Sequence, residues 1–404
     1  MITLKDALEL VLKEVKLMPI ERIDLFSCYG RILAEDIISD IDIPGFDRAA
    51  MDGYAINSIS TLSASPQNPV ILKVIEEIPA GKKPNKKILI NECSMIMTGS
   101  LMPEGSDSVV MLEEVETLSN SEGKFIKIKR EIKKGENVSY KGEDIKKGEL
   151  ILSSGIKLEP NHIGILGSLG YKNVIVRKRP KVGILITGNE IISPGKKLTF
   201  GKIYDANSYS LYSLIIKYGG IPVYLGISKD DYTSLETKIK QGLKNDILLI
   251  SGGVSEGNYD LVIDVLKKLK VKQIFWKVAV KPGKPVFFGK KGKTLIFGLP
   301  GYPVSAFLNF QNLVRPCILK MLGQEKIEKK KIKAILTQTI ENKGDRLSFI
   351  RVKLKEENGK IFADVFPKQK SGILKSIVFC DGVVNLPVGS EIRQGEEVEV
   401  ELLF

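Results

Sequence analysis

The sequence predicts a multidomain α/β protein with a mainly parallel sheet at its centre. From about residue 180 to 323, apolar runs alternate with stretches of helical periodicity; the runs are KVGILIT, IPVYLGI, DILLIS and KTLIFG. Continuous apolar runs fit strands that are buried on both faces, and the alternation is typical of βαβ units. At 404 residues the chain is also longer than one ordinary domain, so roughly two to four domains are expected.

The segments on either side of this region predict smaller domains. An amphipathic helix is expected over residues 4–15, with Thr3 as its N-cap. Short β-type runs cut by Gly and Pro follow between about residues 41 and 144, and a second helix is expected to begin near Pro160. Alternating strands over residues 334–404 predict a small barrel or sandwich. The expected domains are 1–26 with 145–178 (helical linking domain), 27–144 (β-rich), 179–323 (central α/β) and 324–404 (C-terminal, β-barrel-like).

Composition indicates a soluble, cytoplasmic protein without disulfides. Hydrophobic residues make up 43% of the chain and charged residues 27%, and the mean hydropathy is +0.01. No apolar run approaches the roughly 20 residues that span a bilayer, and the N-terminus lacks the continuous apolar region of a signal peptide. The 4 scattered cysteines, without a CxxC pair, argue against disulfides and a zinc finger. The single histidine, His162, excludes multi-histidine metal sites and disfavours a Ser-His-Asp triad, so we expect a packing or helix-start role for it.

The excess of basic residues predicts an anionic ligand. Lys and Arg number 61 against 48 Asp and Glu, a net charge of +13, but they are spread along the chain with few aromatic residues between them. A nucleic-acid stripe is usually more clustered, so small anions are favoured over nucleic acid. In VAVKPGKPVFFGKKG, Lys281 and Lys284 stand between prolines and a glycine, which restrict the backbone and place the two ammonium groups.

Loops that follow the predicted parallel strands are candidates for phosphate binding. Ligands of open α/β sheets lie beyond the carboxyl ends of the strands, where this chain reads TGNEIISPG, SGGVSEGNYD and LPGYPVSA. Glycines free backbone N–H groups for phosphate oxygens, while Glu190 and Asp260 could hold Mg²⁺ against those phosphates. An ordinary βα turn is the alternative for any one of these loops, and no GxxxxGKS/T motif supports a P-loop. The candidates are Thr187, Gly188, Ser251, Gly252, Gly253, Ser255, Pro300, Gly301 and Ser305.

The stretch PGFDRAAMDGYAI lies outside the predicted sheet. Asp47 and Asp52 flank two alanines and Met51, an unusual apolar centre between carboxylates. The stretch is either a structural turn or a rigid rim whose carboxylates face a metal or a polar ligand. The residues by themselves leave both interpretations open.

Motifs along the whole chain resemble those of one enzyme family. In chain order they read FDRAAMDGYA, MTGSLMPEGSDSVVMLEEV, KGEDI, ITGNEI, IYDANS, ISGGVSEGNYD, KPGKP and GLPGYPVSAFL. This is the order seen in molybdopterin molybdenumtransferases, the MoeA-type family, which is similar to the C-terminal E domain of gephyrin. The resemblance implies a MogA-like central domain that binds molybdopterin and a transferase of molybdenum cofactor biosynthesis.

The resemblance also implies an answer for the lysine pair. Family members insert molybdate into the dithiolene of adenylylated molybdopterin with the help of Mg²⁺ and release AMP. Molybdate is then the anion expected beside Lys281 and Lys284, with Ser305, Arg346 and Ser371 completing its pocket. A compact dianion suits convergent lysines, because an ammonium about 4 Å away gains several kcal/mol before desolvation costs. The implied catalysis is positioning and electrostatics, with both lysines neutralising charge.

Further residues and partners follow from the same resemblance. The pterin phosphates and the adenylate are expected along the TGNE, YDANS and SGGVS loops, and the Mg²⁺ ligands at Glu190, Asp260 and Asp230. A homodimer is expected, in which a second protomer brings residues of the other domains to the cleft. A transient contact with a molybdopterin adenylyltransferase is also implied, and neither nucleic acid nor a membrane is expected as a partner. The remaining implied residues are Asp205 and Asn207 for ligand binding, and Asp52, Thr98 and Asp144 for activity.

Some positions depart from the usual pattern of this family. Arg48-Ala49 replaces Asn-Ser, Ser139 replaces a common arginine, and Tyr302 replaces an asparagine. Two alternatives to the molybdenumtransferase function also stay open. A paralogue that inserts tungstate is one, since the two oxyanions are almost identical in size and charge. A scaffold comparable to gephyrin is the other.

Overall fold

The computed structural model describes residues 1–254 and 261–404, and the chain forms two compact units. The α/β–barrel unit consists of Met1–Glu35, Ser154–Ile163 and Lys172–Phe404. The β-rich unit consists of Asp36–Ser153 and Gly164–Tyr171. The four domains expected from the sequence divide the chain more finely, and their boundaries stay predictions.

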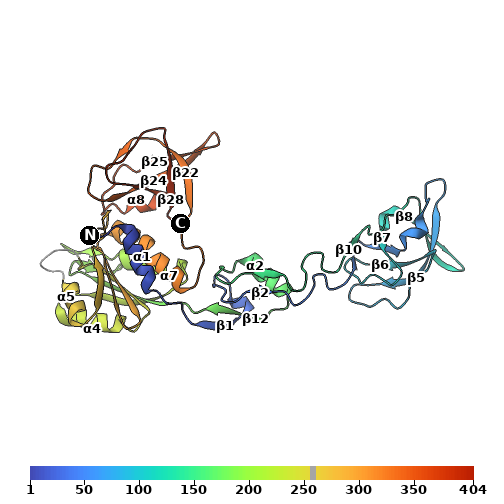
Figure 1. Cartoon of the computed structure of the whole chain (residues 1–404), viewed down its shortest axis with the longest axis horizontal. Coiled ribbons are helices and arrows are strands. Elements are labelled where there is room, and N and C mark those ends of the chain that lie inside the picture. The colour runs from blue at the N-terminus through green and yellow to red at the C-terminus, as the bar shows by residue number, and fades with distance from the viewer. Residues whose placement is uncertain (255–260) are drawn as a thin grey trace. The chain divides into compact units, whose positions relative to one another are not determined.

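The α/β–barrel unit is built on a six-stranded sheet (Figure 1). Its strand order is β16-β13-β17-β21-β20-β18; the first four strands run parallel, whereas β20 and β18 are antiparallel to their neighbours. The mainly parallel sheet expected from the apolar runs is therefore confirmed. The strands are β13 (Lys181–Thr187), β16 (Ile221–Ser228), β17 (Ile247–Ser251), β18 (Lys272–Trp276), β20 (Phe287–Lys291) and β21 (Thr294–Leu299).

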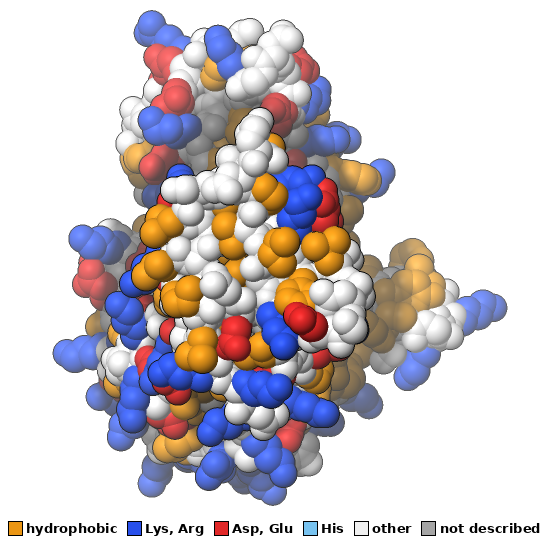
Figure 2. All heavy atoms as spheres, turned by 90° about the vertical axis from the view of Figure 1, so that its right-hand side faces the viewer, with side chains coloured by type: hydrophobic (Ala, Val, Ile, Leu, Met, Phe, Trp, Pro, Cys, Tyr) orange, Lys and Arg blue, Asp and Glu red, His pale blue; other side chains and the backbone are white. Residues whose placement is uncertain are grey.

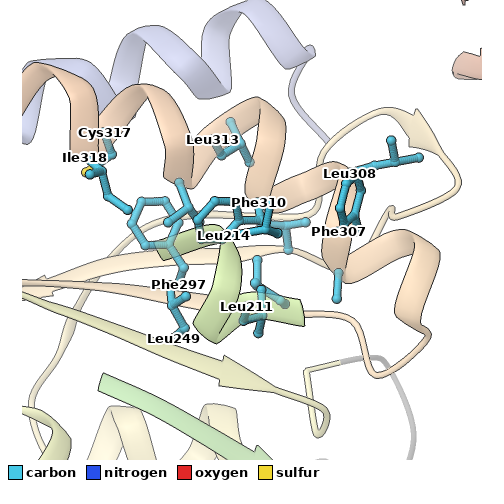
Figure 3. Close-up of a cluster of buried hydrophobic side chains, with 14 of the residues drawn as sticks. Leu211, Leu214, Leu249, Phe297, Phe307, Leu308, Phe310, Leu313, Cys317 and Ile318 are labelled. Atoms are coloured by element: carbon cyan, nitrogen blue, oxygen red, sulfur yellow. The ribbon is translucent and has the colours of Figure 1, made fainter. Parts of the chain in front are cut away.

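Helices cover both faces of this sheet, because successive residues of each strand point to opposite sides. On one face, α1, α3 and the continuous helix α6–η4–α7 pack around Leu249 and Phe297 (Figure 3). On the other face, α4 and α5 pack around Leu248 and Ile250. The bounds are α1 (Leu4–Glu14), α3 (Asn207–Lys217), α4 (Tyr232–Gly242), α5 (Leu261–Lys268), α6 (Pro303–Asn309), the π-helical η4 (Phe310–Val314) and α7 (Arg315–Met321).

The C-terminal strands of the same unit close into a barrel. β24 pairs with both β25 and β26, and β22 and β28 complete the ring, so the barrel has no open edge. β19 (Val280–Lys281) pairs in parallel with the start of β24, which connects the lysine pair to the barrel. The barrel expected from the sequence is confirmed. Its elements are β22 (Lys331–Leu336), β23 (Ile340–Glu341), β24 (Leu347–Glu357), β25 (Lys360–Val365), α8 (Lys375–Val378), β26 (Gly382–Leu386), β27 (Glu391–Ile392) and β28 (Glu397–Leu402).

Shorter elements complete this part of the chain. The side chain of Thr3 accepts a hydrogen bond from the Asp6 N–H, so the expected N-cap of α1 is confirmed. α2 (Pro160–Ser168) begins at the expected proline. His162 lies in its first turn, where Nδ1 accepts a hydrogen bond from the Glu159 N–H. The remaining elements are β1 (Ile20–Asp24), which pairs with β12 (Asn173–Arg177), η1 (Leu25–Ser27), and β14 (Ile191–Ile192), which pairs with β15 (Ile203–Tyr204).

The β-rich unit contains its own six-stranded sheet in the order β7-β4-β6-β5-β9-β8. Only the β5–β6 pair in this sheet is parallel. Two short antiparallel pairs, β3 with β10 and β2 with β11, lie outside it. The elements are β2 (Ile37–Ile38), β3 (Arg48–Ala49), β4 (Gly53–Ile56), η2 (Ser58–Thr61), β5 (Val70–Ile78), β6 (Glu92–Ile96), β7 (Ser108–Met111), η3 (Leu112–Glu114), β8 (Val115–Asn120), β9 (Gly123–Ile128), β10 (Val138–Ser139) and β11 (Leu150–Leu152).

The surface and the cysteines agree with the composition. Figure 2 shows Lys and Arg side chains interspersed with acidic and hydrophobic ones instead of forming one continuous band. All four cysteines are buried and free. Within the described part of the chain, no helix has the length and apolar character needed to cross a bilayer.

Candidate functional site

A cavity of about 1190 Å³ lies at the carboxyl ends of the parallel strands. Thr187 at the end of β13, Ser251 at the end of β17 and Pro300 directly after β21 all line it. This is the position that open α/β sheets use for ligands. The candidates that line the cavity are Thr187, Gly188, Glu190, Asp205, Asn207, Asp230, Ser251, Gly252, Gly253, Lys281, Lys284, Pro300, Gly301, Ser305, Arg346 and Ser371.

The glycine loops of the cavity lie close together, and at Gly252 the approach is closer than a side chain would allow. Gly252 has a φ of +100°, and a Cβ on it would lie 2.6 Å from the carbonyl oxygen of Thr187. A Cβ on Gly301 would lie 3.7 Å from the Cα of Gly252. The loops after β13, β17 and β21 therefore present bare backbone on one wall of the cavity, and backbone N–H groups of this kind bind phosphate.

Asn207, at the start of α3, ties these loops together. Its Nδ2 donates hydrogen bonds of 2.8 Å to the Ser251 hydroxyl and of 2.8 Å to the Gly301 carbonyl. Asp205 accepts a hydrogen bond of 3.0 Å from the Ser208 N–H and one from the Ser208 hydroxyl, which ties it to the first turn of the same helix. Both side chains are buried, so their role in the free protein is to hold the wall in place.

The lysine pair lines the cavity next to the barrel, which we call the barrel side. Lys281 belongs to β19 and pairs in register with Ser348 of the barrel, while Lys284 follows the turn at Gly283. Within the described residues, neither ammonium group forms an ion pair. Two ammonium groups without an ion-pair partner thus line the cavity, where an anion can pair with them.

The tail contributes Arg346 and Ser371 to the same side. Arg346 Nε donates to Asp345 Oδ1 at 2.9 Å; this bond is the largest cause of the lowered pKa of Asp345, and the charge of Lys284 adds to it. Ser371 accepts a hydrogen bond from the Val304 N–H through its carbonyl at 3.3 Å. The tail segment is therefore fastened to the start of the helix that carries Ser305.

A buried arginine supports this tail segment. Arg351 is fully buried, and burial lowers its pKa to about 10. Its backbone N–H donates to Gln369 Oε1 at 3.0 Å, and its Nε donates to the Ser376 hydroxyl at 3.3 Å. Because Gln369 and Ser376 stand on either side of Ser371, Arg351 holds both flanks of that residue.

Two of the expected metal ligands lie on adjacent loops of the cavity. Asp230 Oδ2 accepts a hydrogen bond of 3.0 Å from the Asn189 N–H, and the Glu190 carboxylate lies against Gly188, where a Cβ would be 2.7 Å from Oε1. Among the described residues, no group of three or more His, Cys, Asp or Glu could hold a metal ion. Asp260 and Ser255 lie outside the described residues.

Asp52 and Thr98 lie together in the β-rich unit, and neither lines the cavity. Asp52 Oδ1 accepts hydrogen bonds from the Thr98 N–H at 2.6 Å and from the Thr98 hydroxyl at 2.7 Å. These two bonds, the backbone one first, hold the pKa of Asp52 below its usual value. Asp144 is exposed, and its backbone N–H donates to the Ile43 carbonyl.

Two of the departures from the family pattern face each other in the β-rich unit. Ser139 of β10 lies directly opposite Arg48 of β3 in the antiparallel register. Partners at such positions have Cβ atoms about 4.5–5.5 Å apart on one face of the pair. Arg48 therefore starts from the strand position that neighbours Ser139, where the family resemblance leads one to expect an arginine.

Sequence reasoning missed several residues of the cavity. Gln369 and Lys370 precede Ser371 in the tail, where the motif matches only loosely, and Tyr204 belongs to a strand of two residues. Tyr302 was noted only as a departure, yet it lines the cavity with 65% of its surface exposed. The signal available in the sequence was a tyrosine within the loop motif GLPGYPVS, because aromatic rings often contact ligands.

Comparisons with known proteins agree over the whole chain. Three family models match: the MoeA N-terminal region (domain I and II) over residues 2–170, a probable molybdopterin binding domain over 183–320, and the MoeA C-terminal region (domain IV) over 333–403. The molybdopterin molybdenumtransferase of Haemophilus influenzae is 39% identical over 87% of this chain and 85% of its own length. That of Bacillus subtilis is 33% identical over 92% of this chain and 87% of its own length.

Solved structures give the same answer. Two structures of the molybdopterin biosynthesis MoeA protein from Pyrococcus horikoshii match over 100% of this chain and over 99% and 100% of their own chains. Their TM-scores are 0.86 and 0.83, at 36% and 35% sequence identity. The family models, the relatives and these structures together show that the chain belongs to the MoeA family of molybdenum cofactor biosynthesis.

Proposed function

We propose that this protein is a molybdopterin molybdenumtransferase that inserts molybdate into adenylylated molybdopterin, releases AMP and requires Mg²⁺. The proposal rests on one observation: Lys281 and Lys284, which form no ion pair within the described residues, line the same cavity as the glycine loops of the parallel sheet. The two features suit two different anions, an inorganic oxyanion and a phosphate-bearing ligand. An enzyme that joins a metal oxyanion to a phosphorylated pterin needs both.

Molybdate is expected on the barrel side of the cavity. Lys281 and Lys284 supply positive charge, and the buried Ser305 hydroxyl and Ser371 supply hydrogen-bond donors. An ammonium at about 4 Å from one unit of negative charge gains about 4 kcal/mol at an effective dielectric of about 20, before desolvation is counted. Arg346 lines the same side, but its charge is shared with the neighbouring Asp345, so the two lysines supply most of the attraction for a dianion.

The pterin phosphates and the adenylate are expected on the glycine-loop side. Gly252, Gly253 and Gly301 leave room for a phosphate against backbone N–H groups, and Asn207 holds that wall together. Tyr204 and Tyr302 offer ring faces to a planar heterocycle in the same cavity.

Glu190 and Asp230 are the residues proposed to hold Mg²⁺. Both are carboxylates of the cavity wall, and neither is neutralised by an ion pair within the described residues. Mg²⁺ is usually held by one or two carboxylates together with phosphate and water, so this donor set fits the ion. When bound, the ion would neutralise charge on the phosphoanhydride.

The residues of this chain then act by positioning and charge. The glycine loops orient the phosphates, and the lysines hold the oxyanion and stabilise the negative charge that accumulates as the phosphoanhydride is cleaved. No histidine lines the cavity within the described residues, so the proposed chemistry uses no imidazole base.

Asp52, Thr98 and Asp144 are proposed to act from a second protomer of a homodimer. The support is that they are polar and exposed in the β-rich unit, as residues that complete a partner's site need to be. The charge-dispersed surface and the cavity chemistry favour small anions over nucleic acid as partners, and a cytoplasmic location is proposed with this function.

The direct test is reconstitution of the reaction. The purified protein is mixed with adenylylated molybdopterin, Mg²⁺ and molybdate, and AMP release is followed together with formation of molybdenum cofactor. AMP release that depends on both Mg²⁺ and molybdate supports the proposal. Release that is unchanged when molybdate is omitted, with no cofactor formed, would contradict it.

A tungstate-inserting enzyme is the second candidate. The lysine pair and Ser305 would hold either dianion, because the two differ little in size and charge. Competition between the two oxyanions in the same reconstitution, with the product metal measured by mass spectrometry, separates the candidates.

A further inference from the structure

Asn309, the last residue of α6, bridges the lysine segment to the helix that carries Ser305. Its side chain is fully buried, with 0% exposure. Nδ2 donates one hydrogen bond of 3.0 Å to the Gly283 carbonyl and a second of 2.9 Å to the Ser305 carbonyl. A primary amide has two N–H hydrogens, so both are used in this bridge.

The bridge joins two parts of the proposed oxyanion pocket. Gly283 lies between Lys281 and Lys284, and Ser305 lies one helical turn before Asn309 on α6. All but Asn309 line the same cavity. Asn309 therefore connects the segment that supplies the positive charge to the one that supplies the buried hydroxyl, while lying outside the ligand space itself.

Gly283 is shaped for this contact. It has a φ of +115°, and a Cβ placed on it would lie 2.4 Å from Asn309 Nδ2. An added methyl group would thus occupy the space of the amide nitrogen. The lysine segment and Asn309 fit together only because this position is glycine.

One polar atom of the Asn309 side chain lacks a hydrogen-bond partner within the described residues. Its acceptor, Oδ1, is buried and has no hydrogen-bond partner in the described part of the chain. A buried polar atom without a partner opposes folding, so this oxygen does not explain why an amide stands here. The two donated hydrogen bonds, and what they hold together, remain the reason for an amide here.

We propose that Asn309 is a positioning residue that sets the distance between the lysine pair and Ser305 and thereby the affinity for the oxyanion. This inference rests on the proposed function, in which those residues bind molybdate. Asn309 touches neither molybdate nor the pterin; it acts through Gly283 and Ser305. A compact anion is bound tightly only when all its donors converge on it. A small displacement of the lysines relative to Ser305 should therefore lower the affinity for the anion considerably.

The test compares Asn309→Leu with the wild-type protein. Leucine keeps about the same volume but donates no hydrogen bond, so the lysine segment is released from α6. We expect the dissociation constant for molybdate alone, measured by isothermal titration, to rise by about tenfold or more. The KM for molybdate should rise by a similar factor, whereas the KM for adenylylated molybdopterin should change little. The melting temperature should fall somewhat, because the Gly283 carbonyl loses its donor.

A matched control uses a second buried amide. Asn245 is also buried and donates through Nδ2 to a backbone carbonyl, that of Gly242 at 2.9 Å, but it does not line the cavity. Asn245→Leu should leave molybdate binding unchanged. Asn309→Thr keeps a donor that can reach the carbonyl of Ser305 but not the link to Gly283, so it should weaken molybdate binding as Asn309→Leu does, and it replaces the latter if that variant does not fold.

The outcomes separate this inference from the proposed function. If the wild-type protein binds no molybdate or tungstate, the proposed function fails. If the wild type binds the oxyanion and the Asn309 variants bind it equally well, or lose only thermal stability as a merely structural residue would, the positioning role is overturned while the function stands.

Discussion

The two compact units carry their candidate residues in different ways. In the α/β–barrel unit, residues from Thr187 to Ser371 converge on one cavity, although more than half of the unit's chain separates some of them. In the β-rich unit, Asp52, Thr98 and Asp144 are exposed and line no cavity that the structure describes, although Asp52 accepts hydrogen bonds from Thr98, 46 positions away. The first arrangement forms a ligand-sized cavity, whereas the second leaves polar groups exposed, which we propose act on a ligand held by another protomer.

This difference teaches how the proposed work is divided. Affinity for the two anions should depend on the α/β–barrel unit, because its cavity supplies charges and backbone donors together. Turnover should also depend on the β-rich unit, because a second protomer is proposed to supply its residues. Variants in the two units should therefore affect binding and turnover differently.

The largest effect is expected from Lys284→Ala. Removal of one of two convergent charges should lower molybdate insertion at limiting molybdate by about 100-fold, while adenylylated pterin still binds to the glycine loops. Lys293→Ala, a lysine of the β20–β21 turn that does not line the cavity, is the control. Near-normal insertion by Lys284→Ala would contradict the proposal that the lysine pair binds the oxyanion.

Asp52→Asn should lower turnover by roughly tenfold or more and leave molybdate binding unchanged. The reason is that Asp52 belongs to the β-rich unit and lies outside the cavity that binds the oxyanion. The measurement is kcat alongside the dissociation constant for molybdate. If Asp52→Asn lost molybdate binding and turnover to the same extent, the proposal that the two units serve binding and turnover separately would be wrong.

Arg48→Ser should lower turnover by several-fold, and Arg48→Ser with Ser139→Arg should restore most of it. The two positions are cross-strand partners, so a guanidinium from either strand reaches the same surface. Ser139→Arg alone is the control, because it places two like charges opposite each other. If the double variant is as impaired as Arg48→Ser, an arginine at position 139 cannot replace the one at position 48, and the prediction is wrong.

The smallest effect is a shift in pH dependence with Thr98→Ala. Hydrogen bonds from the Thr98 N–H and hydroxyl lower the pKa of Asp52 from 3.8, so its charge persists at a lower pH in the folded protein. The stability from these bonds is present above the unfolded pKa and is lost as the pH falls through the folded value. Losing the hydroxyl should raise the pKa towards 3.8 and move the acid limit of activity to higher pH.

Carbon NMR titration of the Asp52 carboxyl measures this shift directly. Thr98→Ser keeps the hydroxyl donor and should titrate like the wild type. An unchanged titration in Thr98→Ala would mean that the backbone N–H alone sets the pKa, in which case the acid limit of activity should not move either.

The parallel part of the sheet was predictable because its strands are continuous apolar runs. β13, β17 and β21 are buried along their length, and each matches a run read from the sequence. β18 and β20 were not predicted as strands, since KQIFW and FFGKK mix apolar with polar residues at the antiparallel side of the sheet. An edge of a sheet needs less apolar character, and the pattern is weaker there.

The site divides in the same way. Lys281, Lys284 and the glycine loops were predictable because their residue types and order are unusual enough to carry chemistry. The role of Asn309 was not predictable, because no feature of a helical stretch indicates that its side chain contacts a glycine 26 positions earlier. Arg351 was missed for a similar reason, since a strand arginine is expected to be exposed and this one is fully buried.

What the sequence determined by itself is local and periodic: the βα alternation, the caps and turns, the anion-binding residue types and the family pattern. Such features can be read from short stretches, because the periodicity of helices and strands and the backbone freedom of glycine depend on only a few neighbouring residues. The tertiary structure alone decided which of these residues meet: that Lys281 pairs in register with Ser348 of the barrel, that Asn309 joins Gly283 to Ser305, and that Arg48 faces Ser139. Contacts of that kind depend on how distant segments pack, and packing is fixed by the shape of the whole core rather than by any one stretch of it.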